Sequence, residues 1–284
     1  MNLEMGNAPV AVVRGGGDIA TGVVQKLWHA GFQVAILEIA RPLVIRTTVA
    51  LCTAVTNGVA RVEDMTARRV ASPAACQEVW QDGEIPILVD PTCSFLPGLQ
   101  PSLLVDAIIA KKNLGTHRGM APVMIALGPG FSAPEDVDAV IETMRGHDLG
   151  RVILEGRALP NTGIPGEIGG KSAERVVHAP AAGIVRQNRR IGDRVEKGET
   201  ICRIGDVSVP SPLTGTLRGL ISEGMMVPKG LKCADVDPRS EDEVDCLSVS
   251  DKARALGGAV LEAAMYLHRR KKRHPHYEHL KIAG

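Results

Sequence analysis

The hydrophobic pattern near the N-terminus predicts a strand, a glycine turn, a helix and a second strand. Residues 8–13 and 32–37 are short apolar runs, each typical of a buried strand. Between them, apolar residues recur at helical spacing, at Ile19, Val23, Val24 and Leu27. Gly31 fits the position just after the end of this helix. This order of elements is that of a strand–helix–strand unit in an α/β sheet.

Further apolar runs extend the predicted sheet. Residues 85–90 and 103–109 are strand candidates, and residues 123–127 form another buried run that ends at a turn of Gly128, Pro129 and Gly130. Residues 132–135 (Ser-Ala-Pro-Glu) read as a capping box with proline in the first helical turn. The pattern therefore predicts a helix over 132–144, followed by a strand over 151–155. Residues 161–170 are rich in turn residues and indicate a loop or linker.

A repeat with an offset of 32 residues occupies positions 176–238. Its two halves align Pro180 with Pro212, and the same offset relates further pairs: Gly183 and Gly215, Arg186 and Arg218, Gly192 and Gly224, Val195 and Val227, Lys197 and Lys229, Gly198 and Gly230, Ile204 and Val236. Neither half can bury a core alone, so we expect the two to interlock into one small β domain.

The repeat resembles the biotinyl/lipoyl barrel-sandwich fold, whose halves are pseudo-symmetric. In that family the modified lysine lies on the hairpin between the halves. The corresponding segment here, residues 204–210, contains no lysine. A carrier arm needs an acylatable amine, so we expect neither biotin nor lipoate on this chain.

After the repeat, residues 251–267 carry apolar residues at helical spacing, and Gly257-Gly258 weakens the pattern. We expect this helix to pack on the first domain. The predicted organisation is a Rossmann-like α/β domain over 1–170, an inserted all-β barrel-sandwich domain over 176–238, a helix over 245–267 that returns to the first domain, and a basic, histidine-rich tail over 268–284. The tail is either a solvated terminus or a site for acidic partners or metal.

The first glycine turn carries the dinucleotide-binding pattern G-x-G-x-x-A. Gly15 permits a tight turn, Gly17 lets the backbone approach a phosphate, and Ala20 lets the helix lie close to the strand. Glu38 ends the second strand, where an acid can bond a ribose hydroxyl, whereas Arg41 suits a 2′-phosphate instead. The predicted cofactor-binding residues, which include the second glycine turn, are Gly15, Gly16, Gly17, Asp18, Ile19, Ala20, Glu38, Arg41, Gly128 and Gly130.

Composition excludes several classes of function. Aromatic residues make up 2% of the chain and the net charge is +1, which disfavours nucleic-acid binding. No apolar run is long enough to span a membrane, and residues 1–9 lack the pattern of a signal peptide, so we expect a cytoplasmic protein.

The six cysteines form no C-x-x-C pair and are expected to be reduced, with no metal site. Cys93 is either a plain turn cysteine or a soft ligand for sulfur or selenium chemistry.

The segments VVRGGGDIATGV (12–23), GFQVAILEIARPLVIR (31–46), IALGPGF (125–131), RGHDLGRVI (145–153), PNTGIPG (160–166) and VDPR (236–239) resemble the YqeB family of selenium-dependent molybdenum hydroxylase maturation proteins. The first domain also resembles XdhC-type proteins, which load molybdenum cofactor into related enzymes. The resemblance implies a non-enzymatic accessory protein that binds a nucleotide or molybdenum cofactor and delivers it to an apo molybdenum hydroxylase. Homo-oligomerisation is left open.

The alternative function is that of an NAD(P)-dependent oxidoreductase. Such an enzyme needs an acid–base group near the nicotinamide, for which Lys111, His117 and His147 are candidates. None of them lies in a recognisable catalytic motif, so the catalytic residues are not predicted.

Overall fold

The computed structural model describes residues 8–163, 166–167 and 169–273. Its largest element is a nine-stranded sheet in the order β10-β9-β7-β6-β1-β2-β5-β4-β3. These strands are β1 (Val10–Arg14), β2 (Gln33–Glu38), β3 (Val59–Val62), β4 (Met65–Val70), β5 (Ile85–Val89), β6 (Leu103–Asp106), β7 (Val123–Leu127), β9 (Ala139–Ile141) and β10 (Val152–Ile153). All pairs are parallel except the two at the edges, β3 with β4 and β9 with β10.

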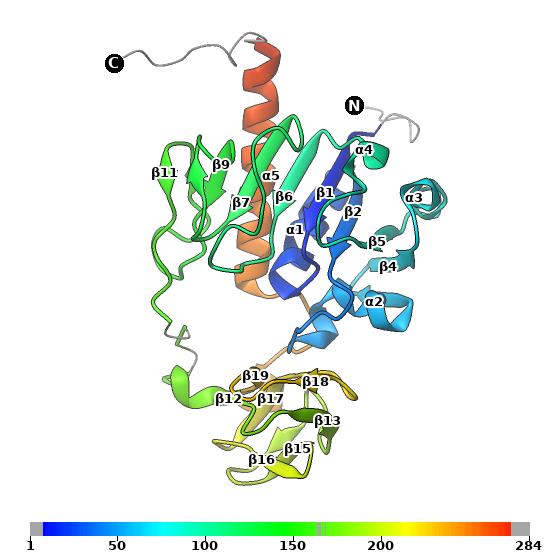
Figure 1. Ribbon diagram of the computed structural model, residues 1–284. Coiled ribbons are helices and arrows are strands. Elements are labelled where there is room, and N and C mark those ends of the chain that lie inside the picture. The colour runs from blue at the N-terminus through cyan, green and yellow to red at the C-terminus, as the bar shows by residue number, and fades with distance from the viewer. Residues whose placement is uncertain (1–7, 164–165, 168, 274–284) are drawn as a thin grey trace.

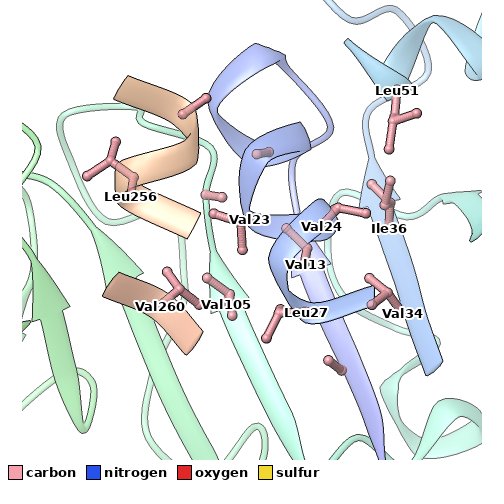
Figure 2. Packing of buried hydrophobic residues seen from close by; sticks show 14 of the residues in the cluster. Val13, Val23, Val24, Leu27, Val34, Ile36, Leu51, Val105, Leu256 and Val260 are labelled. Carbon is pink, nitrogen blue, oxygen red and sulfur yellow. The ribbon is translucent and has the colours of Figure 1, made fainter. Parts of the chain in front are cut away.

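Helices cover both faces of this sheet (Figure 1). One face carries α1 (Asp18–His29), α5 (Asp251–Arg273) and the short α2 (Ala54–Asn57), and the other carries α3 (Cys76–Gln81) and α4 (Leu96–Leu99). In Figure 2, Val23, Leu27 and Val260 of the helices lie with Val13 and Val105 of the central strands. The near-continuous apolar strands follow from this burial on both faces.

Helix α5 packs directly on α1, and two glycines allow the close approach. A Cβ atom on Gly22 would lie 2.4 Å from the carbonyl oxygen of Ala253, and one on Gly257 would lie 2.2 Å from the carbonyl oxygen of Gly22. The apolar face of α5 buries Leu256 and Val260 completely, whereas Met265 is 56% exposed. Helix α5 is thus part of the core around α1, and its Gly257 is a packing position rather than only a weak point in the helix.

The helix predicted over 132–144 is wrong. This segment forms β8 (Ser132–Ala133), which pairs with β11 (Gly156–Arg157), and then β9 at the edge of the main sheet. Asp138 holds it there, because its backbone nitrogen donates to the carbonyl oxygen of Met124 and its carboxylate accepts a hydrogen bond from the backbone nitrogen of Met124. The apolar spacing of the segment fits either a helix or a buried strand, and the free edge of β7 decided between them.

Residues 176–237, here called the β module, form two four-stranded antiparallel sheets. One has the order β12-β19-β17-β14 and the other β16-β15-β13-β18. The strands are β12 (Val176–His178), β13 (Gly183–Gln187), β14 (Arg194–Val195), β15 (Thr200–Ile204), β16 (Val207–Pro210), β17 (Gly215–Leu220), β18 (Met226–Val227) and β19 (Lys232–Asp237).

The two sequence repeats exchange strands in this module. β13, β14 and β15 start 32 residues before β17, β18 and β19, and each sheet combines strands of both repeats. A single core of residues such as Val185, Leu217 and Val236 lies between the sheets. Neither repeat closes this core alone, which explains why the sequence carries two copies.

The β module contacts the α/β part beyond the carboxyl ends of the central strands (Figure 1). The backbone nitrogen of Leu220 in β17 donates to the carbonyl oxygen of Ile45 over 2.7 Å, and Arg46 forms a parallel bridge with Leu220. The protein is therefore an α/β protein with a mostly parallel open sheet and separate small antiparallel sheets. Within the described ranges, no helix has the length and apolar character needed to cross a membrane.

Candidate functional site: two adjoining clefts at the carboxyl edge of the sheet

The first glycine turn connects β1 to α1 at the carboxyl edge of the sheet. Gly15 has a φ of +93°, which side chains rarely adopt, and its backbone nitrogen donates to the carbonyl oxygen of Leu37. Gly17 is the N-cap of α1 and no side chain caps the helix there. A Cβ atom on Gly17 would meet nothing within 4 Å. The first turn of α1 thus borders an open space, where its free backbone N–H groups favour an anion and the carboxylate of Asp18 opposes one.

The carboxylate of Glu38 lies against this turn. One oxygen accepts a hydrogen bond from the backbone nitrogen of Gly16 over 2.8 Å, and the other accepts one from Ile39 over 2.7 Å. Burial raises the pKa of Glu38, and the two backbone hydrogen bonds oppose that rise. Each carboxylate oxygen can accept a further hydrogen bond, so Glu38 retains the acceptors that a ribose diol would need.

These residues line a cleft of about 340 Å³, here called the glycine cleft. Its wall combines the turn and the start of α1 with apolar side chains that remain partly exposed, among them Ile39 (44%), Leu43 (48%) and Ile108 (37%). Of the predicted site residues it contains Gly15, Gly17, Asp18, Ile19, Ala20 and Glu38. A turn with open backbone donors beside apolar side chains suits a phosphate attached to a flat heterocycle.

A larger cleft of about 620 Å³, here called the basic cleft, adjoins the glycine cleft and shares Asp18 and Ile19 with it. Two acidic side chains, Asp18 and Asp235, line the basic cleft. Seven basic side chains also line it: Arg46, Lys111, Arg145, Arg175, Arg218, Lys232 and Lys252. The residues come from the start of α1, from the connections after β2, β6 and β9, from the segment just before β12, from the β module and from the start of α5. Such an excess of positive charge raises the local concentration of anions.

Some of these cations are already paired within the protein. The guanidinium group of Arg175 binds the carboxylate of Asp235, which also lies 3.5 Å from Arg218. Arg145 donates two hydrogen bonds, of 2.9 and 3.1 Å, to Asp251. By contrast, no described carboxylate lies within ion-pair distance of Arg46, Lys232 or Lys252.

The structure leaves several predicted site residues outside the clefts. Arg41 is exposed and lines neither of them. Gly128 and Gly130 also line neither, although Pro129 between them lines the basic cleft, and no helix follows them to bind a phosphate. Gly128 lies against Thr143, and Gly130 lies against the backbone of Lys112. These two glycines thus allow close packing of the loops, because a Cβ atom on either would come within 2.8 Å of a neighbour.

The structure does not bring together Lys111, His117 and His147, the acid–base candidates for an NAD(P)-dependent oxidoreductase. Lys111 lines the basic cleft, whereas His117 and His147 are exposed and line neither cleft. His117 instead makes a hydrogen bond to the carbonyl oxygen of Arg118. Among the described residues, no group of three His, Cys, Asp or Glu side chains is placed to hold a metal ion.

Sequence reasoning missed Arg46, Arg218, Lys232 and Lys252 as members of one site. The repeat did contain a signal for Lys232 and for the neighbouring Asp235. The offset of 32 places Lys232 against Thr200 and Asp235 against Arg203, so the copies differ in charge where the second copy faces the cleft. Positions at which the two copies differ in charge thus indicate which surface of the duplicated module lines a binding cleft.

Cys93 lacks the surroundings of an activated thiol. It is 6% exposed, and burial raises its pKa to about 11 even though Arg14 opposes that rise. At pH 7 a thiol with that pKa is about one part in ten thousand thiolate, and the thiolate is the reactive form. The hypothesis of a sulfur or selenium relay at Cys93 therefore gains no support from this geometry.

All six cysteines are free and buried. We expect the native protein at pH 7 to react slowly with a chromogenic disulfide reagent, and the denatured protein to release six equivalents at once. A native thiol that reacts within seconds at pH 7 would contradict this expectation, and peptide mapping of the labelled protein would show whether that thiol is Cys93.

Comparison with known proteins gives one strong sequence match. The uncharacterized protein YqeB of Escherichia coli (strain K12) is 54% identical over 258 residues, which are 91% of this chain and 48% of that protein. The chain is a homologue of YqeB. It spans about half the length of YqeB, and no family model matches the chain.

Two solved structures are distantly similar to the chain. The product-bound ectoine utilization protein EutE (DoeB) from Ruegeria pomeroyi is 11% identical with a TM-score of 0.24, over 81% of this chain and 85% of that chain. An aspartoacylase family protein from Mesorhizobium loti is 8% identical with a TM-score of 0.25, over 81% of this chain and 85% of that chain. TM-scores this low carry no argument about fold or function.

Proposed function

We propose that the protein binds a phosphate-bearing ligand of the nucleotide type in the glycine cleft and serves as an accessory protein in the maturation of a selenium-dependent molybdenum hydroxylase. The ligand is either a molybdenum cofactor or an NAD(P)-like nucleotide. The observation that carries the proposal is the uncapped, open N-terminus of α1 at Gly17, next to Glu38 and to a cleft with seven basic side chains.

The residues present fit the phosphate end of a molybdenum cofactor. Because Gly17 has no side chain, the space beside its backbone is empty. In the adjoining cleft, the Nε atom of Arg46 is buried without a hydrogen-bond partner. A bound cofactor would supply the redox-active molybdenum that the client hydroxylase needs. This chain would bind the phosphate with the backbone of the turn and cover the heterocycle with Ile39 and Leu43.

The role in maturation rests on the resemblance of the sequence motifs to the YqeB family. In this proposal the α/β part is a Rossmann-like domain and the β module is a barrel-sandwich domain of the biotinyl/lipoyl type without a carrier lysine. The partner is an apo molybdenum hydroxylase, which receives the ligand in the cytoplasm. In this proposal the protein itself catalyses no redox turnover; of the three acid–base candidates, Lys111 lines the basic cleft and the two histidines line neither cleft.

Native mass spectrometry of the freshly purified protein tests the proposal. We expect the protein to retain a phosphate-bearing pterin or nucleotide, and we expect no consumption of NADH or NADPH when a hydride acceptor is added. Steady oxidation of NADH by the purified protein would instead support the oxidoreductase. A protein that retains no ligand and binds neither NADH nor ADP in calorimetry would remove the binding function.

Gly17→Val is the variant that tests the glycine cleft. Because a Cβ atom there meets no protein atom, we expect the fold to survive with a small drop in melting temperature, since valine is a poorer N-cap than glycine. We expect a loss of ligand retention of at least about tenfold, since the valine occupies the space beside the backbone donors. Native mass spectrometry and a thermal melt of the same preparation measure the two effects. Equal retention by the variant and the wild type would place the ligand elsewhere.

A further inference from the structure

Arg46 is a buried arginine of the basic cleft that, unlike Arg175, has no ion-pair partner among the described residues. It follows β2 in the connection that touches the β module, and only 5% of it is exposed. Its Nε atom is buried and has no hydrogen-bond partner. Buried polar groups are normally hydrogen-bonded, so an arginine of this kind lining a cleft indicates an absent acceptor. Burial and the nearby Arg218 lower the pKa of Arg46, and the charges of Asp18, Cys246 and Asp235 oppose that fall.

Two lysines reach the same cleft from other parts of the chain. Lys232 starts β19 in the β module, and Lys252 lies in the first turn of α5. Desolvation lowers the pKa of both lysines, although Lys232 is the more exposed of the two. Asp18 opposes this effect at Lys232, at Lys252 and at Arg46, so it is the carboxylate that faces all three cations.

The remaining acids near the cleft are engaged elsewhere. Asp235 is bound by Arg175 and lies near Arg218, and Asp251 is bound by two hydrogen bonds from Arg145. Asp18, and Asp235 with its own arginine partner, therefore face cations that have no ion-pair partner among the described residues: Arg46, Lys232 and Lys252. An anion with two or more charges would restore the balance and would pair with the guanidinium group of Arg46.

We infer that Arg46, Lys232 and Lys252 form a second anion site, for a phosphate or pyrophosphate group, that the α/β part and the β module build together. The inference rests on the proposed function, because the basic cleft continues into the glycine cleft past Asp18 and Ile19. A ligand with a nucleotide-like group at the glycine turn would place its further phosphate among these cations. The ligand class is thus a nucleoside diphosphate or a dinucleotide rather than a monophosphate.

Titration calorimetry of the full chain with inorganic pyrophosphate tests the site. We expect binding that weakens as sodium chloride is raised, as for an ionic site. Lys232→Gln should weaken pyrophosphate binding at least about fivefold, because it removes a charge-assisted hydrogen bond. Lys229→Gln is the matched control, since Lys229 lies three residues away, is exposed and lines neither cleft.

Two further variants make the test specific. Asp18→Asn removes the opposing charge and should tighten pyrophosphate binding, whereas Lys232→Gln loosens it. Arg46→Gln should abolish pyrophosphate binding. Because Arg46 is buried, a thermal melt of this variant must show that it still folds. The exposed Lys232 keeps the test valid if Arg46→Gln does not fold. Lack of pyrophosphate binding by the wild type, or an equal effect of the Lys229 and Lys232 substitutions, would overturn the inference.

Comparison of ligands separates this inference from the proposed function. ADP should bind more tightly than both AMP and pyrophosphate, because it reaches both clefts. Pyrophosphate that binds independently of Gly17→Val, without any binding of ADP or NADH, would support the second anion site and refute the nucleotide function. A retained ligand that depends on Gly17 but is indifferent to Lys232→Gln would support the function and refute the second site.

Discussion

Truncation of the chain after Arg239 should unfold the α/β part, although every strand of its sheet remains. The deletion removes α5, which buries Leu256, Val260 and Leu267 against α1 and the sheet. Each such side chain contributes roughly 1.5–3 kcal/mol, and the net stability of a domain is only about 5–15 kcal/mol. Loss of the whole helix therefore removes most or all of the free energy of unfolding. Circular dichroism and a thermal melt of the truncated chain measure the effect.

Excision of residues 176–237 with a short linker is the control for this truncation. The β module has its own core between two sheets, and its backbone hydrogen bond to the α/β part runs from Leu220 to Ile45. We expect the excised protein to fold and to melt cooperatively. A truncated chain that melts like the full chain, together with an excised chain that does not fold, would assign α5 to the β module instead.

Gly257→Ala should destabilise the protein, and Gly258→Ala should stabilise it. Both glycines lie inside α5, where alanine is intrinsically favoured by about 0.8–1 kcal/mol. At Gly258 an added Cβ atom meets nothing within 4 Å, so that preference is realised. At Gly257 the Cβ atom would lie 2.2 Å from the carbonyl oxygen of Gly22 and would force the two helices apart. Overpacking of this kind costs about 1–3 kcal/mol or more.

Chemical denaturation of the two variants measures this difference as a change in the free energy of unfolding. Both variants add one methyl group, at neighbouring positions of the same helix. The contribution of helix propensity is therefore the same in both and cancels in the comparison. Gly22→Ala, whose Cβ atom would lie 2.4 Å from the carbonyl oxygen of Ala253, should behave like Gly257→Ala. Equal stabilities of the Gly257 and Gly258 variants would mean that α1 and α5 do not pack as closely as described.

The sequence alone was sufficient for elements whose signals are local. The strand, glycine turn, helix and strand from β1 to β2 carry their apolar periodicity and their turn residues in one short segment, and they lie within about two residues of the predicted bounds. The offset of 32 residues anticipated that β13, β14 and β15 recur as β17, β18 and β19. Such features depend on contacts near in sequence or on direct comparison of two segments.

The segment 132–144 shows where local signals fail. Its apolar residues and its capping box fit a helix, yet β9 and the two-residue strand β8 form there. The free edge of β7 offers hydrogen bonds to the backbone of β9, and Asp138 fixes the segment to Met124. Spacing in the sequence contains no information about such an edge, so tertiary pairing overrides it.

The sequence by itself determined the glycine turn, the acid at the end of β2, the duplicated β module and the presence of a final amphipathic helix. Only the tertiary structure decided that Arg46, Lys232 and Lys252 face one cleft, because they lie far apart in the chain and meet through the packing of α5 on α1 and of β17 on the connection after β2. A glycine turn is specified by local backbone conformation, whereas a charge cluster is specified by distances in space that no local pattern encodes.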